Sequence, residues 1–206
     1  MKTKIYFTSD WHVGHTNVLD FDNRPFKDLG EMHEKLVKNF NMLVPDHGIT
    51  YFLGDMGLCS SGLLKSIIDQ LKGTKVLIRG NHDGKMISMY NAGFDIVLDK
   101  AQITVGKNII TMSHCPLYGV YRENTSGMRN QTGEENWHGE ERHKDKYTFN
   151  DFGQVHLHGH IHSPNGGKSE RVLGRQMDIG VTANKYKPVS LDQVQSFISS
   201  LTEFKL

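Results

Sequence analysis

The sequence predicts an α/β fold built around a mostly parallel sheet. In the first half of the 206-residue chain, short apolar runs alternate with segments whose apolar residues recur at helical spacing. Each apolar run ends in a cluster of polar residues, as strands do where they reach the ligand-binding edge of an open sheet. The length is sufficient for one domain, residues 1–206, with a sizeable hydrophobic core.

The apolar runs of the first half are interpreted as three buried strands, and the periodic segments as two helices. In chain order these elements cover residues 5–7, 31–43, 51–53, about 63–71 and 76–78. Alternation of strand and helix favours right-handed crossovers and therefore parallel pairing of the strands.

The second half is predicted to contain shorter strands and one helix. The strand candidates are residues 102–105, 109–112, 155–158 and 176–181. The first two flank Gly106 and Lys107, which is typical of a hairpin. Apolar residues from Leu191 to Leu201 recur at helical spacing, so a closing helix with Ser190 as its N-cap is expected.

Composition excludes several classes of protein. The formal net charge is only +1, so no global attraction to nucleic acid or to a membrane surface is implied. The chain contains two cysteines, Cys59 and Cys115, in separate segments, which argues against a disulfide framework. The apolar run near Met1 is too short for a signal peptide, and no segment approaches the ~20 apolar residues of a membrane span. An ordinary soluble enzyme of the cytoplasm is expected.

Polar islands with metal-binding side chains follow the predicted strands. They supply carboxylates, imidazoles and one amide oxygen, but no thiolate, which is the ligand set of divalent cations such as Mn, Fe or Zn. Seven candidate ligands are too many for one ion and enough for two ions that share a bridge. These candidates are Asp10, His12, Asp55, Asn81, His114, His160 and His162. Because Asp55 and Asn81 follow neighbouring strands, their side chains are expected to converge.

The order of these islands resembles the calcineurin-like metallophosphoesterase superfamily. The resemblance rests on Asp-x-His, Gly-Asp, Gly-Asn-His-Asp, a single His and Gly-His-x-His, and it extends from residue 7 to about residue 190. It implies a four-layer α-β-β-α sandwich in which two mixed sheets are flanked by helices.

The resemblance also implies a role for each candidate ligand. Asp10, His12 and His162 would bind one divalent ion. Asn81, His114 and His160 would bind a second ion, and Asp55 would bridge the two. The ligand set favours Mn²⁺ and leaves Fe, Ni and Zn open. Such a pair of ions would activate a bridging hydroxide for in-line attack on phosphorus.

His82 and Asp83 are the candidate catalytic residues. His82 resembles the family histidine that contacts the phosphate and can protonate the leaving oxygen. Asp83 would orient this imidazole by a hydrogen bond. The alternative for Asp83 is a purely structural role as a loop or helix cap.

Three further residues are candidates for substrate binding. His15 and Asn17 could line the pocket or cap a short helix. Arg24 could bind phosphate through its guanidinium group, or form a surface salt bridge. The stretch 9–26 is similar to a subgroup of small phage- and bacteria-encoded phosphoesterases, and a phage origin would place the protein in the host cytoplasm.

Residues 120–150 form a polar segment without a sustained period. Two interpretations remain open, a surface loop and a substrate lid, since the segment lies between two ligand islands.

A two-metal phosphoric ester hydrolase, with a preference for diesters, is the function that the sequence favours. A small phosphoester or nucleotide is the expected substrate, and the near-neutral charge disfavours long nucleic acid. The alternatives are a nuclease or cyclic-nucleotide phosphodiesterase, a phosphomonoesterase, a protein phosphatase, and a metal-binding scaffold without turnover.

Overall fold

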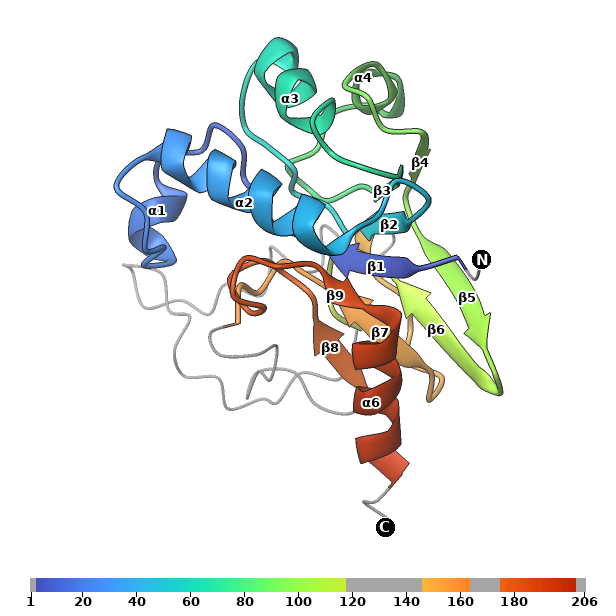
Figure 1. Ribbon diagram of the computed structural model, residues 1–206. Helices are drawn as coiled ribbons and strands as arrows, with labels where there is room; N and C mark the ends of the chain where they lie inside the picture. The colour runs from blue at the N-terminus through green and yellow to red at the C-terminus, as the bar shows by residue number, and fades with distance from the viewer. Residues whose placement is uncertain (1–2, 118–145, 164–174, 203–206) are drawn as a thin grey trace, which may run out of the picture.

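The computed structural model describes residues 3–117, 146–163 and 175–202. These residues form two mixed sheets that are flanked by helices (Figure 1). Most of the polar segment 120–150, interpreted as a surface loop or a substrate lid, lies outside the described part of the chain, so the two interpretations are not distinguished.

The first sheet has five strands in the order β4-β3-β2-β1-β9. Four of them are parallel, and β9 is antiparallel to β1. The strands cover β1 Ile5–Thr8, β2 Ile49–Phe52, β3 Thr74–Ile78, β4 Ile96–Leu98 and β9 Val189–Ser190. Parallel pairing brings the carboxyl ends of β1, β2 and β3 to one edge of the sheet, as expected from the strand–helix alternation.

The second sheet has four strands in the order β5-β6-β7-β8. The hairpin expected about Gly106 is confirmed, because β5 and β6 pair antiparallel with Val105 opposite Asn108. β6, β7 and β8 are parallel to one another. The strands cover β5 Ala101–Val105, β6 Asn108–Met112, β7 Val155–His158 and β8 Gln176–Asp178.

The longer helices have N-terminal caps that the local sequence supplies. The side chain of Asp28 accepts a hydrogen bond from the backbone of Glu31, and Ser60 does the same for Leu63. Ser190 Oγ accepts from the Gln193 backbone while the Gln193 side chain accepts from Ser190, a capping box. The helices cover α1 Val18–Phe21, α2 Leu29–Leu43, α3 Ser61–Ile68, α4 Met86–Asn91 and α6 Leu191–Thr202.

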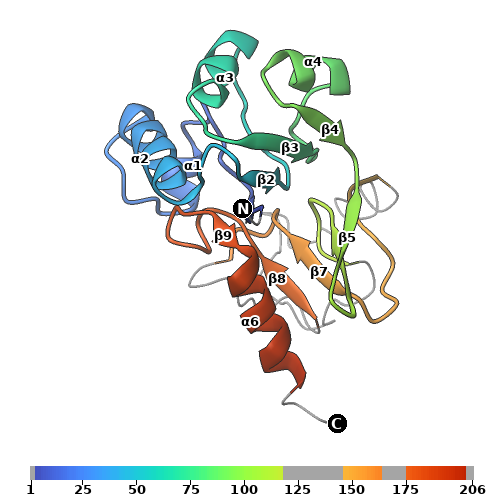
Figure 2. The same cartoon turned by 45° about the vertical axis from the view of Figure 1, so that its right-hand side comes forward.

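Two hydrophobic clusters hold these layers together. Alternate residues of the first sheet enter opposite clusters: Tyr6 and Phe52 face the helices α2, α3 and α4, whereas Phe7 and Leu53 face the second sheet. The second cluster also receives Val194 of α6. Both views place α2, α3 and α4 on one side of the first sheet and α6 on the other, beside β8 and β9 (Figures 1 and 2). The expected fold class is therefore confirmed.

Some elements differ from the sequence prediction. The short elements α4, β4 and β9 were not anticipated, because two to six residues are too few to show a period. The short helix after Asn17, which the sequence left as one alternative, is present as α1. The helix α3 ends at Ile68 rather than near Leu71, and β8 ends at Asp178 rather than at Val181. After Asp178 the chain turns toward the ligand islands instead of extending the strand.

Candidate metal centre

The polar islands meet where the strands of both sheets end. Six carboxylate and imidazole side chains form two groups, and within each group one ligand atom of every residue lies within 4.8 Å of the others. The first group is Asp10, His12 and His162, and the second is Asp55, His114 and His160. Residues from both halves of the chain contribute to each group.

The backbone is strained at five of the six positions in these groups. Non-glycine residues rarely adopt positive φ, and such residues concentrate at functional sites. Eight non-glycine residues of the described chain have positive φ, and five of them belong to the two groups. Their φ angles are 58° for Asp10, 53° for His12, 53° for Asp55, 70° for His160 and 45° for His162.

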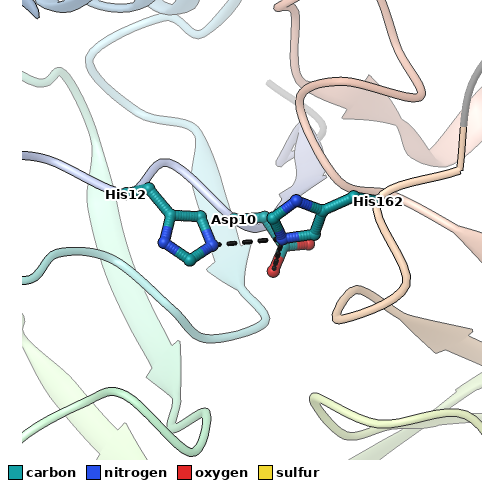
Figure 3. Close-up of side chains that lie close together, drawn as sticks. All are labelled: Asp10, His12 and His162. Atoms are coloured by element: carbon teal, nitrogen blue, oxygen red, sulfur yellow. Dashed lines mark hydrogen bonds and ion pairs between the residues drawn. The ribbon is translucent and has the colours of Figure 1, made fainter. Parts of the chain in front are cut away.

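The first group is compact and largely shielded from water. His12 Nε2 lies 3.1 Å from His162 Nε2, and His162 Nε2 lies 3.5 Å from Asp10 Oδ1. Figure 3 shows the two imidazoles turned toward each other with the carboxylate of Asp10 beside the His162 ring. Asp10 and His12 are buried, so this cluster of polar atoms needs either protons or a cation to be stable.

The second group is connected to the first through Asp55. Asp55 Oδ2 lies 3.3 Å from His114 Nε2, and His114 Nε2 lies 3.3 Å from His160 Nδ1. The same Asp55 oxygen is 3.9 Å from His12 Nε2 of the first group. One carboxylate oxygen therefore faces imidazoles of both groups.

Asn81 provides an independent test of whether the residues suit a metal. Its Oδ1 atom is buried, and it has no hydrogen-bond partner among the described residues. A buried, unsatisfied amide oxygen is costly and uncommon. A divalent cation within reach of this amide oxygen would satisfy it, which is compatible with the ligand role expected for Asn81 from the sequence.

Charges within the two groups shift the pKa values of their members. Burial alone would lower the pKa of His114, but the negative charges of Asp55 and Asp10 outweigh it and raise that pKa to about 9. Burial also opposes the protonation of His162, yet Asp10 and Asp22 raise its pKa to about 10. The carboxyl group of Asp10 has a pKa well below its usual range, because His162 overcomes the effect of burial. Without a cation, protons on His114 and His162 balance the carboxylates.

Hydrogen bonds from outside the groups fix the orientation of two imidazoles. His162 Nδ1 lies 2.8 and 2.9 Å from the two carboxylate oxygens of Asp22. His114 Nδ1 lies 2.8 Å from the carbonyl oxygen of Leu53. In both rings Nε2 is left facing the group. Asp22 was missed by the sequence analysis, since nothing in its spacing connects it with His162.

The position of Arg24 differs from the phosphate-binding position expected from the sequence. Its guanidinium group is fully buried and faces the back of the ligand loop, where it donates to Asp22 and to the carbonyl oxygens of Asp10 and Trp11. These contacts occupy the groups that would bind a phosphate. Arg24 therefore has a structural role instead of the expected role in substrate binding. Its salt bridge to Asp22 is buried, so the alternative of a surface salt bridge is also wrong.

His82 and Asp83 are arranged differently from one another. The His82 side chain is 45% exposed, and its Nε2 lies 3.9 Å from Asp55 Oδ2. The carboxylate of Asp83 accepts hydrogen bonds from the backbone N–H groups of Asp55, Met56 and Gly80. Asp83 thus connects the loops after β2 and β3 instead of orienting His82, which corrects the expected pairing in favour of the structural alternative.

His15 and Asn17 take different positions at the rim. His15 Nδ1 lies 3.3 Å from His12 Nδ1, so His15 contacts a candidate ligand from outside the first group. Asn17 precedes α1, where it is exposed and makes no side-chain capping bond. The structure therefore brings His15 to the centre and leaves Asn17 on the surface.

Two glycines provide the space that the candidate ligands occupy. A Cβ atom at Gly159 would lie 2.3 Å from Asp10 Oδ2, and one at Gly80 would lie 2.3 Å from Asp55 Oδ1. The glycines of the Gly-His-x-His and Gly-Asn-His-Asp motifs are thus required because carboxylates of other loops approach the backbone there.

These features define a class of protein: an α/β protein of two mixed sheets with a candidate centre for divalent metal. A family model described as calcineurin-like phosphoesterase matches residues 3–103. The uncharacterized protein MJ1445 of Methanocaldococcus jannaschii is 30% identical over 203 residues, which cover 95% of this chain and 91% of that protein. The Gene 66 protein of Mycobacterium phage L5 is 29% identical over 223 residues, covering 98% of this chain and 97% of the phage protein.

Among solved structures, this fold is similar to that of AQ665 from Aquifex aeolicus, a protein of unknown function. The TM-score is 0.67 with 24% identity, and the match covers 95% of this chain and 99% of that one. On the evidence of the family model and the sequence relatives, the chain belongs to the calcineurin-like phosphoesterase family and is a metal-dependent phosphoesterase. None of the helices in the described part of the chain has the length and apolar character needed to cross a membrane.

Proposed function

We propose that the protein hydrolyses phosphoric diesters with two divalent metal ions. Asp10, His12 and His162 would hold one ion, and Asn81, His114 and His160 would hold the other. Asp55 would bridge them. The observation that carries this proposal is the position of Asp55 Oδ2, which lies 3.3 Å from an imidazole of the second group and 3.9 Å from one of the first.

When bound, the two ions would neutralise charge on the phosphate and supply the activated nucleophile for its hydrolysis. The residues of the chain hold the centre in a fixed geometry through the strained loops and the hydrogen bonds of Asp83. Manganese is the favoured metal, because the donors are carboxylate, imidazole and amide groups without thiolate.

His82 is proposed as the proton donor to the leaving oxygen. Its exposed imidazole lies beside Asp55, at the open side of the centre, where a bound phosphoester would reach it. A general acid contributes ~10²–10⁴-fold and matters most for a poor alkoxide leaving group, which favours diesters. A nucleotide-sized diester is the preferred substrate class, since a net charge of +1 provides little attraction for long nucleic acid.

The first experiment compares turnover of bis(p-nitrophenyl) phosphate and p-nitrophenyl phosphate by protein that has been stripped of metal and refilled with Mn²⁺. A diester preference that disappears in Asp55→Asn would support the proposal. A monoester preference would replace it with a phosphomonoesterase function. Metal-loaded protein without turnover of either ester would contradict hydrolysis and favour the scaffold alternative.

A second experiment isolates His82. In His82→Ala, kcat for a diester with an alkoxide leaving group is expected to fall ~10²-fold or more while metal content stays unchanged. His47→Ala serves as the matched control, because His47 is exposed and lies outside both groups. Equal kcat in the two variants would remove His82 from catalysis.

A further inference from the structure

The carboxylate of Asp22 has an unusually complete set of partners. It follows α1, and its side chain is only 5% exposed. It accepts from Arg24 Nε at 3.0 Å and Nη2 at 2.9 Å, and from Thr182 Oγ1 at 2.9 Å. The remaining partner is His162 Nδ1, at 2.8 and 2.9 Å from the two oxygens.

This contact determines which nitrogen of His162 is free to bind a metal. A carboxylate cannot donate, so Nδ1 carries a proton, and Nε2, which faces Asp10 and His12, is the nitrogen that can bind a metal. The Asp22–Arg24 pair also reaches the loop that carries the other two residues of the group. Arg24 donates to the carbonyl oxygens of Asp10, at 2.9 Å, and of Trp11, at 3.1 Å.

The two groups differ in this respect. In the second group, the outward nitrogen of His114 meets the neutral carbonyl oxygen of Leu53. In the first group, the partner of His162 is a charged carboxylate, which makes an imidazole a stronger ligand.

We propose that Asp22 is a positioning residue that sets the metal affinity of the first group and leaves the second unaffected. The inference rests on the proposed metal sites, but not on the identity of the ester that is hydrolysed. In Asp22→Asn the size is kept while the charge is lost, and affinity for one of two ions is expected to fall ~10–100-fold.

The test is calorimetric titration of metal-free protein with Mn²⁺, together with metal content after dialysis. Thr182→Val is the matched control, because it removes one hydrogen bond to the same carboxylate without touching His162. Loss of affinity at one site only, in Asp22→Asn but not in Thr182→Val, supports the inference. Two sites of wild-type affinity in a folded Asp22→Asn would overturn it, as would equal weakening of both sites.

Circular dichroism of the metal-free variants separates folding from binding, since a purely structural role would lower Tm without changing the ratio of the two affinities. The proposed function fails on a different result: wild-type protein that binds two ions but hydrolyses no ester would contradict it. The titration would still decide the Asp22 inference in that case.

A second observation concerns the rim of the first group. The side chain of Phe21 is an exposed aromatic ring, with 55% of the residue accessible. Its ring centroid lies 5.7 Å from that of His162 at an interplanar angle of 30°, a stacked arrangement, and 5.6 Å from that of His15. One face of the ring thus packs on a candidate ligand, and more than half of the surface of Phe21 is exposed.

We infer that Phe21 is a stacking platform for an aromatic group of the substrate, such as a nucleobase. Water solvates the face of an exposed phenyl ring poorly. Stacking of a base on an aromatic side chain contributes ~1–3 kcal/mol, or about 5- to 150-fold in affinity. The inference rests on the proposed function and deepens it by naming the residue that would hold the base of a nucleotide-like ester.

The test compares binding of AMP and ribose 5-phosphate to the Mn²⁺-loaded protein by calorimetry, so it does not depend on turnover. Phe21→Leu is expected to weaken AMP at least 5-fold and to leave ribose 5-phosphate unchanged, whereas Phe21→Trp restores AMP binding. Phe152→Leu is the control, because Phe152 is 61% exposed and has no ring contact with the centre in the described part of the chain. Equal effects on both ligands, or no effect on AMP, would overturn the inference.

Discussion

Asp83 holds the loop of Asp55 in its strained conformation through direct hydrogen bonds. Asp83 Oδ2 accepts from the backbone N–H of Asp55 at 2.9 Å, and Oδ1 accepts from Met56 at 2.9 Å. Oδ2 also accepts from Gly80 at 2.8 Å, so one carboxylate ties the loop after β2 to the loop after β3. The loops that carry the candidate bridging residue and Asn81 are therefore held together by a side chain that belongs to neither metal group.

Removing this carboxylate should destabilise the protein. Asp83→Ala leaves three backbone N–H groups without their partner, and the free energy of unfolding is expected to fall by ~3 kcal/mol or more. Urea denaturation of metal-free protein measures this loss. His82→Ala, one residue away and exposed, is the control. A loss below ~1 kcal/mol would show that water replaces the carboxylate.

A methyl group at Gly159 should disrupt the first metal group. The added Cβ would lie 2.1 Å from Ser9 Oγ and 2.3 Å from Asp10 Oδ2, so Asp10 must move. We expect Gly159→Ala to bind one ion fewer, with a loss of stability of ~1–3 kcal/mol. Gly62→Ala is the control, because its Cβ meets nothing within 4 Å and alanine favours the helix α3. Full metal content in Gly159→Ala would contradict the geometry.

Metal removal should lower Tm, and the effect should depend on pH. The pKa of His114 is about 9 and that of His162 about 10 in the metal-free protein, so metal ions compete with protons there. Because these two pKa values are raised, protonation stabilises the metal-free fold fully below the ordinary histidine pKa of about 6.5. This stabilisation decreases as the pH rises above that value and is lost as the pH passes 9 to 10. The decrease in Tm on chelation, several degrees at neutral pH, is therefore expected to be larger at pH 8.5 than at pH 6.5. A Tm that is independent of metal at both pH values would contradict the prediction.

His156 should make the fold sensitive to acid independently of the metal centre. Burial, and then the nearby charge of His158, lowers the pKa of His156 to about 3. The neutral ring donates from Nε2 to the carbonyl oxygen of Cys115, and its Nδ1 accepts from the hydroxyl of Thr111. The unfolded chain takes up this proton near pH 6.5, so the stabilisation is complete above that pH and is lost as the pH falls toward 3.

Between pH 7.5 and 5.5 this loss amounts to about 1.4 kcal/mol. His156→Gln cannot titrate, so its free energy of unfolding should decline less over the same range, by about that amount. Parallel pH profiles of wild type and variant would show that His156 keeps an ordinary pKa.

Much of the centre follows from local sequence. Short apolar runs predicted β1, β2 and β3, and parallel strands necessarily end at the same edge, which explains why Asp55 and Asn81 could be expected to converge. Most of the non-glycine residues with positive φ in the described chain are candidate ligands of the motifs. Their polar side chains and the glycines next to them lie within a few positions of each other in the sequence.

The sequence could not distinguish residues that face the substrate from residues that support the ligand loops. Arg24 follows the first island closely enough to reach a phosphate, and only the packing of α1 shows that its guanidinium lies behind the Asp10 loop. Asp83 lies next to His82 in the chain, yet its carboxylate is directed to the backbone of Asp55, 28 residues away.

By itself, then, the sequence determined most of the strands, the family of the protein and the chemistry of its candidate ligands, because these depend on residue type and on short-range periodicity. The tertiary structure alone decided which outer side chains hold those ligands. Asp22 and His162 are separated by 140 residues and meet only because α1 and the loop after β7 pack against the same end of the sheets. A contact of this kind is fixed by how whole elements pack, and no local pattern encodes it.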